Sequence, residues 1–124
     1  MYLIDTHILL WSLDSVENLS PKAKEVLQFE KVFVSAVSLC EIAIKKSLGK
    51  LDIPFTPSEL AEICRQRDIE ILPIKPKHLD LLLELPIIHN DPFDRLLICQ
   101  AQTENLTMVT RDTIIPKYPV KILW

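Results

Sequence analysis

Short apolar segments alternate with helical segments along the whole of this 124-residue chain, and this alternation limits its fold more than any other feature. The expected strands cover residues 2–4, 32–34, 69–74, 107–109 and 120–123. The expected helices cover residues 6–13, 21–29, 36–48, 57–67, 76–85 and 92–105. Strands separated by helices indicate βαβ units, and therefore a mostly parallel sheet with both faces covered. We expect one α/β domain over residues 1–124.

Capping residues predict where several helices begin. Ser20-Pro21, Thr56-Pro57 and Asp91-Pro92 each place a capping side chain before a proline at the first helical position. Gly49, the only glycine, is expected to end the helix over 36–48.

The composition is that of a globular protein, with 48% hydrophobic and 25% charged residues. The net charge of −3 argues mildly against a simple nucleic-acid binder, because phosphate contacts need Lys and Arg. No apolar run approaches the roughly 18 residues that span a bilayer, and the N-terminus lacks the features of a signal peptide. We therefore expect a cytoplasmic location and no membrane association.

The cysteines and histidines form no recognisable metal motif. Cys40, Cys64 and Cys99 are far apart and odd in number, so a disulfide framework or a zinc site is not expected. Each lies in an apolar helical pattern, which indicates buried free thiols. The histidines His7, His78 and His89 are scattered, and we interpret them as surface or core residues.

Two aspartates follow expected strands. Asp5 comes directly after the first strand, and Asp112 follows the fourth strand after Thr110-Arg111. In parallel sheets ligands bind beyond the carboxyl ends of the strands, so both acids are expected at that edge. The alternative is that each merely caps the turn or helix that follows.

Two further acids share apolar faces of helices. Glu41 falls within the helical stripe of Val37, Cys40, Ile44 and Leu48. A glutamate is rarely buried unless it is paired or binds a metal, and the alternative here is an ion pair with Lys45 four residues on. Asp94 shares a face with Leu97, Ile98 and Ala101. Its alternative role is to stabilise the first helical turn through the helix dipole.

These four acids are expected to converge on one pocket. Like charges at one place repel and raise each other's pKa unless a cation neutralises them. Mg²⁺ or Mn²⁺ prefers oxygen ligands, activates water and stabilises charge on a phosphodiester. If metal ions neutralise these four acids, 13 acidic residues remain against 14 basic ones. The remaining net charge then does not oppose binding of a polyanion.

Four segments together resemble the PIN-domain family, and specifically the VapC-type toxins of toxin–antitoxin pairs. The segments are Tyr2-Leu-Ile-Asp-Thr-His, Val34-Ser-Ala-Val-Ser-Leu-Cys-Glu-Ile-Ala-Ile-Lys-Lys, His89-Asn-Asp-Pro-Phe-Asp-Arg-Leu-Leu-Ile and Val109-Thr-Arg-Asp. The resemblance covers the full chain, and the Asp-Pro-Phe-Asp-Arg block is its most specific part.

The resemblance implies a three-layer α/β/α sandwich and a divalent-metal-dependent endoribonuclease. It also implies Mg²⁺ or Mn²⁺ as cofactor, RNA as substrate, a homodimer, and a cognate antitoxin that blocks the site. The family's acids map onto Asp5, Glu41, Asp94 and Asp112. The first three are expected to form the core of the metal site, with Asp112 completing it directly or through water.

Other residues near these acids have two open interpretations each. Thr6 and Thr110 orient carboxylates or metal-bound waters, or they cap helices. Arg95 and Arg111 contact the scissile phosphate, or they pair with the neighbouring acids. Asp91 is expected to cap its helix, with a water-mediated contact to the metal as the alternative. A further set, Lys45, Lys46 and Lys50, guides RNA or forms a solvated helix face.

Three other functions compete with this one. A signalling receiver domain also binds Mg²⁺ at strand ends, but it needs adjacent acids after the first strand, where this chain has Ile4-Asp5-Thr6. The second is a catalytically inactive interaction module, and the presence of all four acids argues against it, because an inactive domain need not keep them. A nuclease that cuts DNA is not excluded, because metal-assisted hydrolysis does not require the 2′-hydroxyl.

Overall fold

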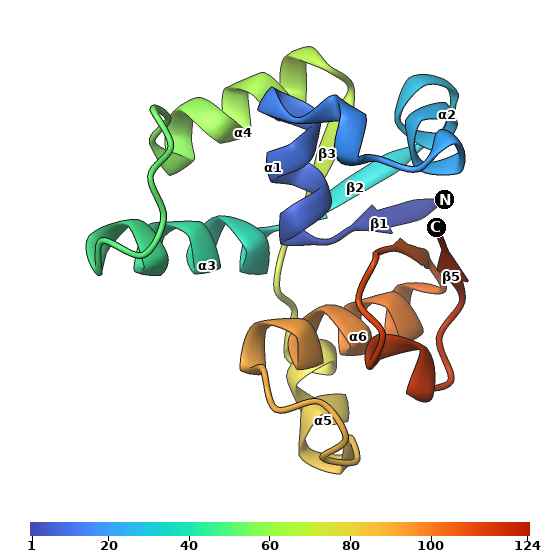
Figure 1. Ribbon diagram of the computed structural model, residues 1–124. Helices are drawn as coiled ribbons and strands as arrows, with labels where there is room; N and C mark the ends of the chain where they lie inside the picture. The colour runs from blue at the N-terminus through green and yellow to red at the C-terminus, as the bar shows by residue number, and fades with distance from the viewer.

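A five-stranded, wholly parallel sheet forms the centre of the computed structural model, which describes residues 1–124 (Figure 1). Its strands are β1 (Tyr2–Ile4), β2 (Val32–Ser35), β3 (Ile69–Leu72), β4 (Thr107–Val109) and β5 (Ile122–Leu123). They lie in the order β3-β2-β1-β4-β5. The parallel sheet expected from the alternating pattern is therefore confirmed.

Six α-helices connect the strands: α1 (Thr6–Asp14), α2 (Pro21–Phe29), α3 (Ala36–Ser47), α4 (Pro57–Gln66), α5 (Pro76–Glu84) and α6 (Pro92–Glu104). The side chains of Ser20, Thr56 and Asp91 cap α2, α4 and α6, as their positions before proline predicted. Two short 3₁₀ helices, Val16–Asn18 and Ile115–Lys117, were not expected. No helix is long and apolar enough to cross a membrane.

The helices form two outer layers around the sheet. Helices α1, α2 and α4 lie on one side and α5 and α6 on the other, with α3 extending from the end of β2 (Figure 1). Neighbouring residues of β1 point to opposite faces, so that Ile4 belongs to the core under α1, α2 and α4, and Leu3 to the core under α5 and α6. This three-layer α/β/α sandwich is the expected fold.

The apolar face predicted for α3 is wrong in part. Val37 is buried, but Ile44 and Leu48 are 41% and 61% exposed, and Cys40 is exposed as well. Because α3 projects beyond the sheet, only the side of it that meets α1, α4 and α6 is covered. The expectation of buried free thiols therefore fails for Cys40, whereas Cys64 and Cys99 are buried and free.

The strand order creates a crevice between β1 and β4. From β1 the chain runs outward through β2 and β3 on one side, and it then returns to place β4 and β5 on the other. Connections leave β1 and β4 toward opposite faces at such a switch point, and ligands bind there, beyond the carboxyl ends of the strands. Asp5 and Thr110 directly follow these two strands, and Ile4 pairs with Val109 in register.

Candidate active site

Asp5 lies at the centre of this crevice. One carboxylate oxygen accepts the backbone N–H of Ile8 at 2.9 Å and so caps α1, while the other accepts the hydroxyl of Thr110 at 2.5 Å. Burial raises the pKa of Asp5, which is only 5% exposed, against the lowering effect of these hydrogen bonds. Asp5 is therefore both a helix cap and a buried carboxylate at the switch point, and Thr110 orients it.

Glu41 is equally buried, at the side of the crevice formed by α3. Its Oε1 accepts the hydroxyl of Thr6 at 2.7 Å, and that hydroxyl lies 3.0 Å from Oγ of Ser38. Its Oε2 accepts the ammonium group of Lys45 at 2.5 Å, and this hydrogen bond raises the pKa of Lys45. The ion pair considered as an alternative is therefore present, and Thr6 holds the other oxygen.

Asp94 and Asp91 have different roles in the first turn of α6. Asp91 caps the helix by accepting the N–H groups of Phe93 and Asp94, as predicted. The carboxylate of Asp94 accepts no backbone N–H. Burial, followed by repulsion from Asp91 and then from Asp5 and Glu41, raises its pKa to about 7. Asp94 therefore carries the least balanced charge of the cluster.

Asp112 closes the cluster from the segment after β4. Its Oδ1 accepts the N–H groups of Ile114 and Ile115 and so holds the turn that leads into the second 3₁₀ helix, and its own N–H donates to the hydroxyl of Thr110. Burial raises the pKa of Asp112, but the two N–H groups and the ring of His89 outweigh it, so the pKa lies below its usual value. Asp112 therefore remains ionised.

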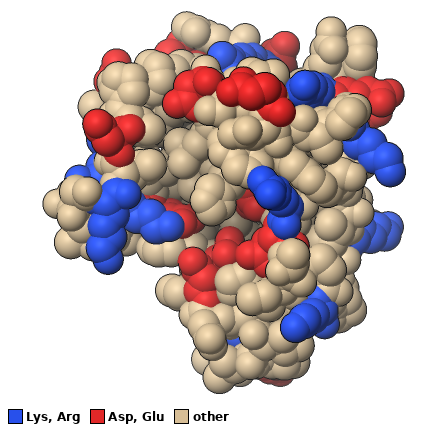
Figure 2. Space-filling model, in the orientation of Figure 1, with Lys and Arg blue, Asp and Glu red and all other residues tan.

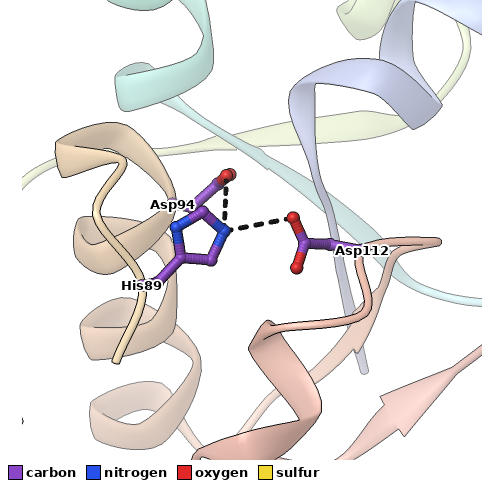
Figure 3. Close-up of side chains that lie close together, drawn as sticks. All are labelled: His89, Asp94 and Asp112. Atoms are coloured by element: carbon purple, nitrogen blue, oxygen red, sulfur yellow. Dashed lines mark hydrogen bonds and ion pairs between the residues drawn. The ribbon is translucent and has the colours of Figure 1, made fainter. Parts of the chain in front are cut away.

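His89 is the residue of this site that the sequence analysis missed. Its Nε2 lies 3.1 Å from Oδ2 of Asp112 and 3.2 Å from Oδ2 of Asp94 (Figure 3). The interpretation of the histidines as scattered is wrong here, although His78 is a buried core residue as expected. A loop position has no periodic pattern, so the only sequence signal is its place two residues before the capping residue of α6.

The cluster opens into a pocket of about 350 Å³. Asp5, Asp94 and Asp112 line it, and Glu41 lines an adjoining pocket of about 160 Å³ with Thr6 and Lys45. In Figure 2 acidic side chains gather in a hollow on this face, with basic side chains beside it. A larger cavity, of about 410 Å³, contains no carboxylate and lies between α1, α2 and β3.

The two arginines next to site acids in the sequence point in different directions. The guanidinium of Arg95 donates to the backbone carbonyls of Leu85 and Pro86 and pairs with no site acid, so that interpretation is wrong, whereas its contact with the scissile phosphate stays a prediction. Arg111 lies over the ring of Trp11, at 5.7 Å from its centroid, and both side chains line the acidic pocket. Arg111 makes no ion pair with the acids.

The lysines of α3 are engaged as well. Lys46 donates to the backbone carbonyls of Ile53 and Phe55, at 2.9 and 2.5 Å, and so fixes the connection to α4. With Lys45 paired to Glu41, neither is a free guide for a polyanion.

The donor set fits a hard divalent cation. Carboxylate oxygens are the ligands that Mg²⁺ and Mn²⁺ prefer. Burial, and after it repulsion from the neighbouring acids, raises the pKa of Asp94 to about 7, as expected where little positive charge lies nearby. A cation bound among these acids supplies that charge, whereas no group of cysteines offers a thiolate site.

Solved structures share this fold along its whole length. A chain of VapBC2 from Rickettsia felis, bound to a DNA fragment of its promoter, matches with a TM-score of 0.70 and 19% identity, over 98% of this chain and 96% of that one. A chain of a toxin–antitoxin complex from Klebsiella pneumoniae matches with a TM-score of 0.67 and 17% identity, over 100% and 97%. VapC20 from Mycobacterium tuberculosis, a toxin that cleaves the sarcin–ricin loop, matches with a TM-score of 0.65 and 12% identity, over 97% and 96%.

These identities establish the fold alone. No curated protein matches the sequence significantly. The family model of the PIN domain, however, matches residues 2–121, which is nearly the whole chain. The chain therefore belongs to the PIN domain family.

Proposed function

We propose that this protein is a divalent-metal-dependent endoribonuclease and the toxin of a toxin–antitoxin pair. The observation that carries the proposal is the convergence of Asp5, Asp94 and Asp112 on one pocket at the crevice between β1 and β4. Glu41 lines the adjoining pocket and lies close enough to raise the pKa of Asp94. The four carboxylates come from four distant segments of the chain, and their mutual repulsion is balanced only in part. Membership of the PIN domain family supports the same conclusion.

These four carboxylates would hold Mg²⁺ or Mn²⁺. When bound, such an ion supplies a water of lowered pKa and stabilises negative charge on a phosphodiester. The protein itself contributes hydrogen bonds that fix the orientation of the carboxylate groups. Thr110 and the Ile8 N–H hold Asp5, and Thr6 holds Glu41, so that their free lone pairs stay directed at the pocket.

Arg111 is the residue that we propose to contact the substrate. It is the only Lys or Arg that lines the pocket shared by Asp5, Asp94 and Asp112. A guanidinium donates several N–H groups in a planar fork that suits a phosphate. Its position beside the carboxylates would place a phosphodiester against them.

RNA and a cognate antitoxin are the partners that we propose. RNA is supported by the likeness to a toxin that cleaves the sarcin–ricin loop, and the antitoxin by the likeness to a toxin–antitoxin complex. A homodimer is supported by large apolar side chains at the surface, among them Leu83 and Ile87, which are 88% and 80% exposed. Light scattering at micromolar concentration tests it, and a monomer would contradict it.

Cleavage assays on the purified chain, freed of any partner, test the activity. We expect it to cut RNA in Mg²⁺ or Mn²⁺ and to stop in EDTA, with Asp5→Asn as the inactive control. Full activity in EDTA would overturn the mechanism. Absence of cleavage in every metal would favour an inactive interaction module, and a preference for single-stranded DNA of the same sequence would change the proposed substrate.

A further inference from the structure

The loop before α6 is held in place by groups that lie outside the carboxylate cluster. The hydroxyl of Tyr118 accepts the N–H groups of Ile88 and His89, at 2.9 and 2.8 Å, and donates to the carbonyl of Pro86 at 2.6 Å. Arg95 donates to the carbonyl of the same proline at 2.8 Å. The backbone of His89 is therefore fixed by two side chains that do not touch the acids.

The hydrogen bonds of the imidazole determine which nitrogen carries the proton. The backbone N–H of Asp91 donates to Nδ1 of His89 at 3.1 Å, so Nδ1 is the acceptor nitrogen of the ring. A neutral imidazole with an acceptor at Nδ1 carries its hydrogen on Nε2. This Nε2–H donates to Oδ2 of Asp112 at 3.1 Å, and Nε2 also lies 3.2 Å from Oδ2 of Asp94 (Figure 3).

The contacts of His89 involve carboxylate oxygens of Asp112 and Asp94 that have no other partner. Oδ2 of Asp112 has no other hydrogen-bond donor, because both backbone N–H groups bind Oδ1. The Asp94 carboxylate has no other partner at all. His89 thus links an acid from the start of α6 to an acid from the segment after β4, and it is itself only 7% exposed.

One ligand atom each of His89, Asp94 and Asp112 lies within 4.8 Å of the other two. We propose that His89 is a positioning residue that holds Asp94 and Asp112 near each other as two ligands of one divalent cation, and that it is not a ligand itself. This rests on the proposed metal-dependent function. Neither ring nitrogen is free to ligate: Nδ1 is occupied by the Asp91 N–H, and Nε2 carries the hydrogen that it donates to Asp112. The carboxylates keep their remaining lone pairs for the metal, as is usual for ligands oriented by an outer hydrogen bond.

Binding of Mn²⁺ alone, measured by electron paramagnetic resonance, tests the positioning role without relying on cleavage. We expect His89→Phe, which removes the donor, to weaken Mn²⁺ binding about tenfold. His89→Gln, which keeps an N–H donor at a similar reach, should recover most of the affinity. Asn90→Ala is the matched control, because Asn90 is exposed in the same loop and makes no hydrogen bond; its affinity should equal that of the wild type. Unchanged or tighter binding in His89→Phe would overturn the proposal.

A spectroscopic measurement distinguishes positioning from ligation. Electron spin echo spectra of the wild-type Mn²⁺ complex should lack the coupling of a directly bound imidazole nitrogen. Such a coupling that disappears in His89→Gln would make His89 a ligand and overturn the proposal. Tyr118→Phe provides a second variant should His89→Phe not fold: it loosens the loop and should weaken Mn²⁺ binding in the same direction.

The two proposals fail in different ways. A wild-type chain that neither binds Mn²⁺ nor cuts RNA would remove the proposed function. A wild-type chain that does both, with His89→Phe unaltered in Mn²⁺ affinity, would remove only the role of His89.

Discussion

The four carboxylates differ in how much of their charge the protein itself balances. Asp5 and Asp112 accept backbone N–H groups, and Glu41 pairs with Lys45. Asp94 has only the imidazole beside it and feels the other acids, which is why burial and repulsion raise its pKa to about 7. Of the four, Asp94 is therefore the one whose charge a bound cation would change most.

Substitutions at the two aspartates of the first turn of α6 should separate catalysis from capping. Asp94→Asn should abolish cleavage in Mn²⁺ and leave the fold intact or slightly more stable, because a repelled charge is removed. Asp91→Ala should lower the free energy of unfolding by about 0.5–2 kcal/mol and retain measurable cleavage. Cleavage kinetics and thermal melts of both variants distinguish the metal-binding role of Asp94 from the capping role of Asp91. The assignment is wrong if Asp91→Ala is stable but inactive while Asp94→Asn still cuts.

The raised pKa of Asp94 also predicts how stability depends on pH in the metal-free protein. The folded pKa of about 7 exceeds the ordinary aspartate pKa of 3.8. Asp94 therefore stabilises the fold below about pH 4, and this contribution is lost as the pH rises toward 7. Relative to Asp94→Asn, the wild type should lose on the order of 1–3 kcal/mol over that range. Urea unfolding of both proteins in EDTA measures this difference, and parallel curves would contradict it.

Helix α1 and the segment after β4 meet at the rim of the pocket, through Trp11 and Arg111. Arg111→Gln should raise the KM for RNA about tenfold, since a charged hydrogen bond to phosphate is lost, and should leave the melting temperature unchanged. Arg111→Lys should recover part of the loss. Arg65→Gln is the control, because Arg65 is exposed and pairs with Glu62 away from the pocket. Equal KM values for Arg111→Gln and this control would exclude the phosphate contact.

Capping signals in the sequence correctly predicted where helices begin, because a helix start is determined by neighbouring residues. The starts of α2, α4 and α6 follow from one capping side chain and one proline, and both lie within the same short stretch of sequence. The face of α3 did not follow from periodicity, because that helix extends past the sheet and leaves Ile44 and Leu48 uncovered. Burial on a helix depends on its neighbours, which the period of its own sequence does not contain.

The residues of the candidate site likewise fall into those that the sequence could predict and those that it could not. Asp5 and Asp112 were predictable as acids at strand ends, once a parallel sheet was expected. His89 and Arg95 were not, because their roles depend on contacts with residues distant in the sequence, such as Asp112 and Tyr118. The place of a carboxylate at the sheet edge follows from topology, whereas the direction of a loop side chain follows from tertiary packing.

A bound metal should stabilise the folded protein against global unfolding. A ligand that binds only the native state stabilises it by mass action, by about 2.7 kcal/mol at a concentration of one hundred times its Kd. The melting temperature should therefore rise in Mn²⁺, and it should rise less in Asp5→Asn. Scanning calorimetry with and without EDTA measures both. An equal rise in the variant would place the metal elsewhere.

The hydrogen bond between Thr110 and Asp5 joins residues 105 positions apart, and it has a consequence for when the proposed activity can begin. A chain still being synthesised carries Asp5 and Glu41 early, but it has neither β4 to complete the crevice nor Asp112 to close the cluster. If the proposed function holds, a partly made chain would be unable to cut RNA. An enzyme that destroys RNA would in this way spare the message from which it is being translated, and its toxicity would begin only when the molecule is finished.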